Sequence, residues 1–463
     1  MDITNATEQQ EQERLVAELA LLQAHRSDLL RQLEEVDLRV EQNAIEMAKF
    51  APVNIDKIPD DVLKLILEDA YQHHNPPDPF ADTPCKMPTA LTATQVCRRW
   101  RRVAASLPTL WQCVHVNLHE EAIALHVSRS VDLPLHLGGR FTSESTTLFV
   151  DLLLKSAHRC KSVSLWSSEV LSSFRLANAL DKIEFKCLEF ISIIDPSASL
   201  VESTMKLAAV SPNLQTLVLH GNIDIQNFSP LPNLRTLYIM TRYDITCEQL
   251  ARLSAAAPRL NDLTIGFDSP ISDGTVISFP NLQTIRFAGV DWDELFGVMD
   301  APQLRSFISF AGPFWTQYSV DIGGQNPPRT YPHMTHMLLH SGMADSREAA
   351  HYPRGFGLFR QAPNLTCLEI IGCGAMSQVL KWLRDTTANQ DDILLPKLET
   401  VSLTDVNDSD LSTVVEFVQR RSHFQPPLRE LKLGAETIEA MGSDVVQMLS
   451  QLVKVSTVSD SEI

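Results

Sequence analysis

The chain has 463 residues and a formal net charge of −18 at pH 7, with 57 acidic against 39 basic side chains. Hydrophobic residues make up 44% of it and charged residues 21%, which matches globular proteins and argues against wholesale disorder. The negative charge disfavours nucleic-acid binding, which usually relies on a basic surface. The length allows two or three domains, or one repeat array with an appendage.

The N-terminus and the cysteines predict a cytoplasmic or nuclear protein. The first ten residues, MDITNATEQQ, are polar and acidic and do not resemble a secretory signal. No apolar run of about 18 residues predicts a membrane-spanning helix. The eight cysteines never form a Cys-x-x-Cys pair, so we expect reduced thiols in a core.

Residues 1–50 predict one long helix, because residues 8–49 contain no proline or glycine. Apolar residues recur every seven positions in two series, a pattern typical of a coiled coil. These residues are Leu15, Leu22, Leu29 and Val36, and in the second series Leu19, Leu33, Val40 and Met47, with Arg26 as a polar break. The segment predicts self-association through residues 8–49, or a helix that folds back on the chain. A monomeric mass for the isolated segment at high concentration would contradict self-association.

Two amphipathic helices are predicted next. The first follows Asp60, a good capping residue, and the second follows Thr89. Between them, residues 75–88 carry five prolines and predict a loop. Because this unit is too small to build a stable core alone, its apolar side chains must pack against another surface. That surface is either a partner or the rest of the chain, which the unit would then cap.

The same segment resembles an F-box motif over about residues 53–118. The resemblance is carried by Ile58-Pro59-Asp60-Asp61-Val62-Leu63, Ile66-Leu67, Val96-Cys97-Arg98-Arg99-Trp100 and the downstream Leu110-Trp111. The proline-rich stretch departs from the short link usual in that family. The resemblance implies docking onto a Skp-type adaptor, and through it onto a cullin-RING ubiquitin ligase. The matching docking positions are Ile58, Pro59, Leu63, Ile66, Leu67, Val96, Trp100 and Trp111.

From Cys160 onward a short pattern recurs. Pro-x-Leu-x-x-Leu-x-Leu begins at Pro212 and returns, with conservative changes, at positions 232, 258, 280, 332, 363, 396 and 426. Weaker copies begin at Cys160 and Leu188, and a distorted one at Pro302, which gives about eleven units spaced by 20–33 residues. This period resembles leucine-rich repeats of the F-box class over about residues 140–453. An ordinary α/β domain with leucine-rich strands is the alternative.

The repeat resemblance implies an α/β solenoid, a leucine-rich-repeat horseshoe preceded by a small all-α unit and the long helix. Leu-x-Leu alternation would bury two side chains per strand and leave the others on a concave surface that binds an unknown protein substrate. We expect that surface to comprise Thr216, Val218, His220, Thr236, Tyr238, Met240, Thr284, Arg286, His336, Leu338, His340 and Glu369, with Ile371, Ser402 and Thr404 beyond them. Tyr, Met and Arg are enriched in protein interfaces.

No nucleotide-binding, hydrolase or zinc-protease motif occurs. The pairs His73-His74 and His115/His119 lack further ligands at convincing spacing. We therefore expect no catalytic residue, cofactor or metal, and predict a non-catalytic substrate-recognition adaptor of an SCF-type ligase, with no nucleic acid or membrane as partner. A leucine-rich-repeat scaffold without a ligase role is the alternative, and an enzyme the third class. Residues 454–463 predict a disordered tail.

Overall fold

The computed structural model describes 23 stretches of the chain in two compact units. They are residues 19, 22–23, 25–33, 35–40, 42, 58–74, 89–167, 183–194, 203–204, 211–221, 223–224, 230–241, 245–266, 275–288, 296, 298–310, 330–340, 357–372, 379–381, 383–384, 394–406, 410–424 and 427–458. The units are Met1–Leu67 and Glu68–Ile463, so their boundary lies inside helix α2 (Asp60–His74). The predicted loop 75–88 lies outside the described residues.

The first unit is helical wherever it is described in the N-terminal segment, including residues 25–33 and 35–40. Ion pairs one turn apart, Arg31 with Asp28 and Arg39 with Glu35, support this helix on its surface. Helix α2 begins at Asp60, and the N–H of Leu63 donates to the carbonyl of Pro59 at 3.0 Å. Its first-turn carboxylates suit the positive end of the helix dipole.

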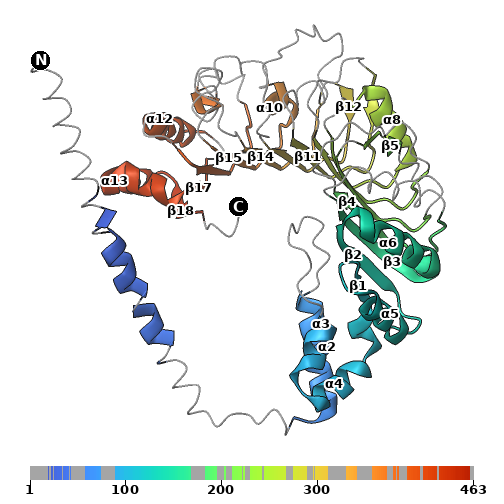
Figure 1. Ribbon diagram of the computed structural model, residues 1–463. Helices are drawn as coiled ribbons and strands as arrows, with labels where there is room; N and C mark the ends of the chain where they lie inside the picture. The colour runs from blue at the N-terminus through green and yellow to red at the C-terminus, as the bar shows by residue number, and fades with distance from the viewer. Residues whose placement is uncertain are drawn as a thin grey trace, which may run out of the picture. The chain divides into compact units, whose positions relative to one another are not determined.

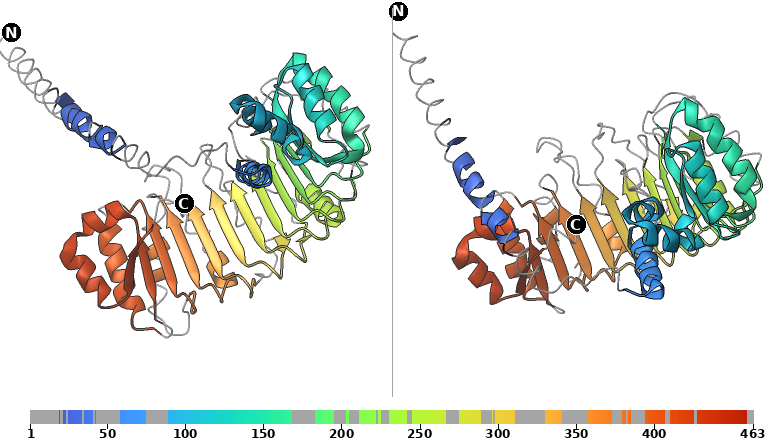
Figure 2. Two further views of the ribbon diagram at one scale, coloured as in Figure 1. Left: turned by 90° about the horizontal axis from the view of Figure 1, so that it is seen from below. Right: turned by 60° about the horizontal axis from the view of Figure 1, so that its bottom comes forward.

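The second unit is mixed α/β and contains a fourteen-stranded sheet in which every neighbouring pair is parallel (Figure 2). In spatial order its strands are β1 (Cys113–His115), β2 (Leu135–Phe141), β3 (Cys160–Ser167), β4 (Phe190–Ile194), β6 (Thr216–His220), β8 (Thr236–Met240), β9 (Asp262–Gly266), β11 (Thr284–Ala288), β13 (Ser306–Phe310), β14 (His336–His340), β15 (Cys367–Ile371), β16 (Thr400–Thr404), β17 (Glu430–Leu433) and β18 (Lys454–Thr457). Two short parallel pairs join β5 (Ser203–Thr204) to β7 (Ile223–Asp224) and β10 (Ile277–Ser278) to β12 (Met299–Asp300).

The helices of this unit precede the sheet or connect its strands. Those with both ends among the described residues are α3 (Thr89–Val96), α4 (Arg98–Ala105), the 3-10 helix η2 (Pro108–Trp111), α5 (Glu120–Arg129), α6 (Ser143–Ser156), the 3-10 helix η3 (Ala157–Arg159), α8 (Cys247–Ala256), α10 (Gly357–Gln361), α12 (Leu411–Arg421) and α13 (Ala435–Ser450). Within this unit the strands line the inner side of an arc, and α8, α10 and α12 lie on its outer side (Figure 1). The core therefore lies between the sheet and its outer layer.

Each of the eleven predicted copies supplies one strand of the sheet, from β3 to β17, including the distorted copy at Pro302, which forms the regular strand β13. The proline of a copy occupies the second position of a turn. In the copy at Pro212, the N–H of Leu214 donates to the carbonyl of Ser211 at 3.4 Å. The following leucines are buried, as Leu217 and Leu219 are in β6. One short pattern thus provides both the turn and the core.

An asparagine after the proline connects successive copies, a signal that the sequence analysis missed. The side-chain amide of Asn233 donates to the carbonyl of Pro212 at 2.8 Å, and that of Asn281 donates to Pro258 at 2.8 Å. Asn364 donates in the same way to Pro332. These bonds satisfy carbonyls at the turns.

The sheet is longer than the predicted range 140–453. It begins with β1 and β2, whose short sequences lack the proline and leucine spacing of the repeats. It ends with β18, so the prediction of a disordered tail from residue 454 is wrong for Lys454–Thr457. Residues 459–463 lie outside the described part of the chain. Across the described helices, none combines the length and the apolar character needed to cross a membrane.

Candidate functional site

The predicted docking residues on helix α2 divide into buried and exposed side chains. Leu63 and Leu67 are almost fully buried, whereas Ile66 is 43% exposed. Pro59 is exposed and Ile58 half-buried. Two further apolar side chains, Val62 and Leu65, are exposed on this helix at 41% and 65%, and the predicted docking positions do not include them. In an amphipathic helix, apolar side chains on one face are normally covered by another part of the protein or by a partner.

In the second unit, Val96 at the end of α3 is 55% exposed, and Trp100 on α4 is half-buried. Cys97 separates the two helices and caps α4, because its Sγ accepts from the N–H of Trp100 at 3.5 Å. Arg98, Arg101 and Arg102 are exposed on α4. We interpret these charges as a solvated helix flank.

Trp111 has a packing role. Its side chain is fully buried, and its Nε1–H donates to the carbonyl of Ala104 at 2.8 Å. The ring of His126 meets it edge-on with centroids 4.9 Å apart, and the guanidinium of Arg129 lies 4.5 Å from its ring centre. Trp111 therefore joins η2 to helix α5 and is inaccessible to a docking partner in this conformation.

The apolar seam of the N-terminal helix is exposed wherever it is described. In one series, Leu22, Leu29 and Val36 are 51–57% exposed. In the other series, Leu19 is 56% exposed, and Leu33 and Val40 are each 61% exposed. Leu15 and Met47 lie outside the described residues. Self-association through this seam stays a prediction.

On the sheet, the predicted surface residues fall into three rows that the parallel register aligns. The first row runs through Thr216, Thr236, Asp262, Thr284, Ser306, His336, Cys367 and Thr400. The second runs through Val218, Tyr238, Thr264, Arg286, Ile308, Leu338, Glu369 and Ser402. The third contains the pairs His220 with Met240, His340 with Ile371, and Ile371 with Thr404.

Most members of these rows are half-buried, but Val218 and Ser402 are buried and therefore less accessible than predicted. Burial raises the pKa of Tyr238, so its hydroxyl stays protonated at neutral pH. Gly266 follows Met240 in the third row, and the Met240 thioether fills the place that a side chain at Gly266 would take. This part of the face is thus aromatic and apolar.

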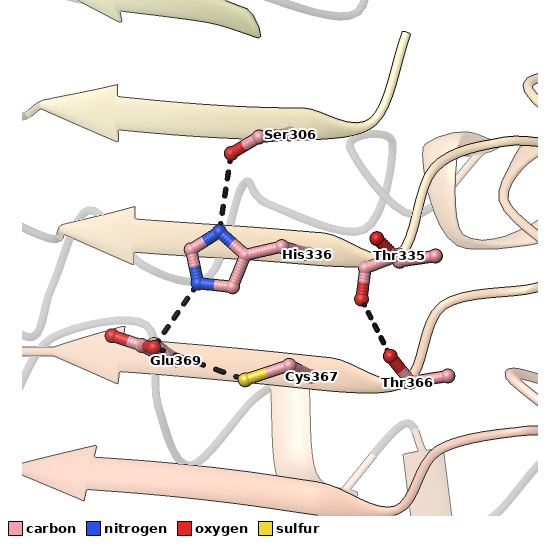
Figure 3. Close-up of polar contacts among 6 residues, drawn as sticks. All are labelled: Ser306, Thr335, His336, Thr366, Cys367 and Glu369. Atoms are coloured by element: carbon pink, nitrogen blue, oxygen red, sulfur yellow. Dashed lines mark hydrogen bonds and ion pairs between the residues drawn. The ribbon is translucent and has the colours of Figure 1, made fainter. Parts of the chain in front are cut away.

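Near β14 and β15 the face becomes polar and titratable (Figure 3). The Nε2 of His336 lies 3.0 Å from Oε1 of Glu369, and its Nδ1 lies 3.1 Å from Oγ of Ser306. The Sγ of Cys367 lies 3.8 Å from the same Glu369 oxygen. Among the described residues, these three side chains form the one group of His, Cys and carboxylate donors that converges in this way.

The electrostatics of this group follow from its contacts. Hydrogen bonds with Cys367 and Glu369 raise the pKa of His336 to about 9, against the opposing effect of burial. The hydrogen bond with His336 lowers the pKa of Glu369. Sequence reasoning selected His336 and Glu369 for the face but missed Ser306 and Cys367. Their role depends on which residues face one another across strands, and no local motif carries that information.

No protein-family model matches this chain, and no curated protein sequence matches it.

Proposed function

We propose that this chain is a non-catalytic protein-capture subunit: its helical segment docks on a Skp-type adaptor of a cullin-RING ubiquitin ligase, and its sheet binds the protein substrate. The observation that carries the proposal is the exposure of apolar side chains at Val62, Leu65 and Ile66 on α2 and at Val96 on α3. Apolar side chains on a short helical segment are a ready surface for partner recognition. The docking set is accordingly narrowed to Ile58, Pro59, Ile66, Val96 and Trp100.

The sheet supports the second half of the proposal. Its three aligned rows extend across successive strands and carry Tyr238, Met240, Arg286 and several histidines, all half-buried. Arg286 also lies 3.9 Å from Asp262, which orients its guanidinium on this face. A rigid surface of aromatic, sulfur-containing and charged side chains suits the recognition of a folded protein or an extended peptide.

We include in this proposal that the eleven copies are leucine-rich repeats of the F-box class. Each copy contributes one strand to the sheet, which supports this part of the proposal. A leucine-rich-repeat scaffold without a ligase role remains the second candidate, and the buried state of Leu63, Leu67 and Trp111 favours it, because these residues act in packing. The two candidates differ in whether the exposed apolar residues bind an adaptor.

Pull-down of full-length protein with a purified Skp-type adaptor separates them. We expect wild type to retain the adaptor, and an Ile66→Asp/Val96→Asp variant to lose at least about tenfold in affinity, since an exposed apolar contact becomes a desolvated charge. Both residues are exposed, so the substitutions should leave the fold intact.

The matched control is Leu154→Asp/Val276→Asp, which changes two exposed apolar residues elsewhere, at 57% and 46% exposure. It should bind like wild type. If wild type does not bind, or if the Ile66→Asp/Val96→Asp variant binds as well as the control, the docking proposal is wrong and the scaffold function stands.

A further inference from the structure

The polar group on β14 and β15 offers more than hydrogen bonding. We propose that His336, Cys367 and Glu369 form a three-ligand site for a divalent transition-metal ion, with Zn²⁺ as the best match. This site does not depend on the proposed ligase function, and it departs from our expectation of a chain without metal.

The distances fit a metal ion. A ring nitrogen of His336, Sγ of Cys367 and a carboxylate oxygen of Glu369 all lie within 4.8 Å of one another. Ligand atoms about 2.0–2.3 Å from a tetrahedral zinc lie about 3.3–3.8 Å apart. The separation of 3.8 Å between Cys367 Sγ and Glu369 Oε1 lies at the upper end of that range, and the 3.0 Å between His336 Nε2 and the same oxygen lies just below it. Small side-chain rotations would complete the geometry.

The chemistry of the donors also suits a cation at this place. A metal ion that displaces the proton between His336 and Glu369 would meet an imidazole nitrogen, a cysteine sulfur and a carboxylate oxygen around one small space. Without a metal ion, a proton between His336 and Glu369 satisfies the hydrogen bonding of these two side chains. The thiol of Cys367 then makes only a weak, long contact of 3.8 Å with the Glu369 carboxylate. A zinc ion accepts nitrogen, sulfur and oxygen ligands together, and would satisfy all three.

A hydroxyl behind the histidine supports this arrangement. The Nδ1 of His336 lies 3.1 Å from Oγ of Ser306 on β13, on the side of the ring opposite Glu369 (Figure 3). Metal-binding histidines almost always donate their second nitrogen to such a partner, which fixes the ring and its tautomer. Ser306 would thus keep the Nε2 lone pair directed at the ion.

The sheet holds the ligands in place. His336 and Cys367 are Cα partners across β14 and β15, and Glu369 follows two residues later on the same face. The side chains of His336 and Glu369 are each 32% exposed, so an ion can enter from the sheet surface. Three protein ligands leave a fourth position of a tetrahedral ion open for water or for a group on a bound molecule.

The test measures metal binding by the full-length chain after treatment with a chelator. Competition with a chromophoric chelator should give one Zn²⁺ per chain at this site, and Co²⁺ should produce a sulfur-to-cobalt charge-transfer band. We expect His336→Ala and Cys367→Ser each to weaken Zn²⁺ binding by more than about 100-fold, and Cys367→Ser to abolish the band. Ser306→Ala should weaken binding by about 10-fold, as loss of an outer hydrogen bond does.

Two control variants keep the result specific. Cys187→Ser removes an exposed cysteine elsewhere, and His340→Ala removes a histidine from the same strand four residues on. Both should bind Zn²⁺ like wild type, and circular dichroism should show every variant folded. The proposal is overturned if wild type binds no zinc, or if His336→Ala and Cys367→Ser retain wild-type binding and the cobalt band.

Discussion

Two arginines hold the backbone at residues with unusual dihedral angles. Val131 and Leu395 have φ values of 52° and 50°, in the left-handed region that side chains disfavour. The guanidinium of Arg159 donates to the carbonyl of Val131 and, at 3.2 Å, to that of Leu133. Arg421, which is buried, donates to the carbonyls of Leu395 and, at 3.3 Å, of Leu394. In each case charged donors stabilise a strained turn.

The strain at Val131 can be measured because its side chain is 58% exposed and contributes little packing. We expect Val131→Gly to raise the free energy of unfolding by about 1 kcal/mol, since glycine adopts this conformation without the steric cost of a β-branched side chain. Chemical denaturation followed by circular dichroism measures the change. The control Val276→Gly alters an exposed valine outside the positive-φ set and should destabilise. Equal destabilisation by both would contradict strain at Val131.

At the scale of elements, the junction of η2, β1 and α5 contains two buried histidines. Burial, together with the smaller effect of the nearby His126, lowers the pKa of His115 to about 4. Burial also lowers the pKa of His126, and the charge of Arg129 acts in the same direction. Tyr71 donates to Sγ of Cys113 at 3.3 Å in the same junction. His115 is therefore neutral in the folded chain near pH 6.

This junction should make the protein sensitive to acid. Unfolded histidines take up protons below about pH 6.5, whereas folded His115 does so only near pH 4, so the unfolded state binds more protons between these values. Stability is thus full above pH 6.5 and decreases as the pH falls, by about 2 kcal/mol at pH 5 for His115 alone. The thermal midpoint measured from pH 7.5 to pH 5 should show this decrease.

Replacement of His115 provides the control for that prediction. Its Nε2 is buried with no hydrogen-bond partner among the described residues, so His115→Leu loses no bond there and should flatten the pH dependence. His119→Leu, at an exposed position four residues after His115, should leave the pH dependence of the thermal midpoint unchanged. A pH profile that is the same in His115→Leu and wild type would contradict the assignment.

The success of sequence reasoning differed between elements for physical reasons. Strands β6 to β17 were predictable because each copy repeats a proline that makes a turn and apolar residues that fill the core, and β3 and β4 were predictable from the apolar spacing alone. The alternation of buried and outward residues then placed His336 and Glu369 on one face. The group they form with Cys367 was not predictable, since it depends on the register between strands 31 residues apart. Trp111 matched a docking motif, but its burial depends on α5, which the motif does not include.

At the scale of the whole sheet, its final strand acts as a polar cover. An open parallel sheet presents unpaired backbone groups at each edge, and repeat arrays need a terminal unit with a polar outer side. Strand β18 pairs in parallel with β17, and Lys454 lies 2.7 Å from Glu430 on it. Ser456 donates to the same carboxylate at 3.0 Å. A hydrophobic strand would be an aggregation risk at this position, and these polar residues avoid it.

Removal of β18 tests this role. A chain ending at Val453 loses the backbone pairing from Glu430 to Leu433 and leaves β17, with its buried Leu431 and Leu433, as the new edge. We expect the free energy of unfolding to fall by on the order of 2 kcal/mol and light scattering to show aggregation on warming. A chain ending at Val458, which keeps β18, serves as the control and should behave like the full-length protein. If both truncations are equally stable and soluble, β18 does not protect the edge, and the C-terminal cover of the sheet must be helix α13, which packs beside it.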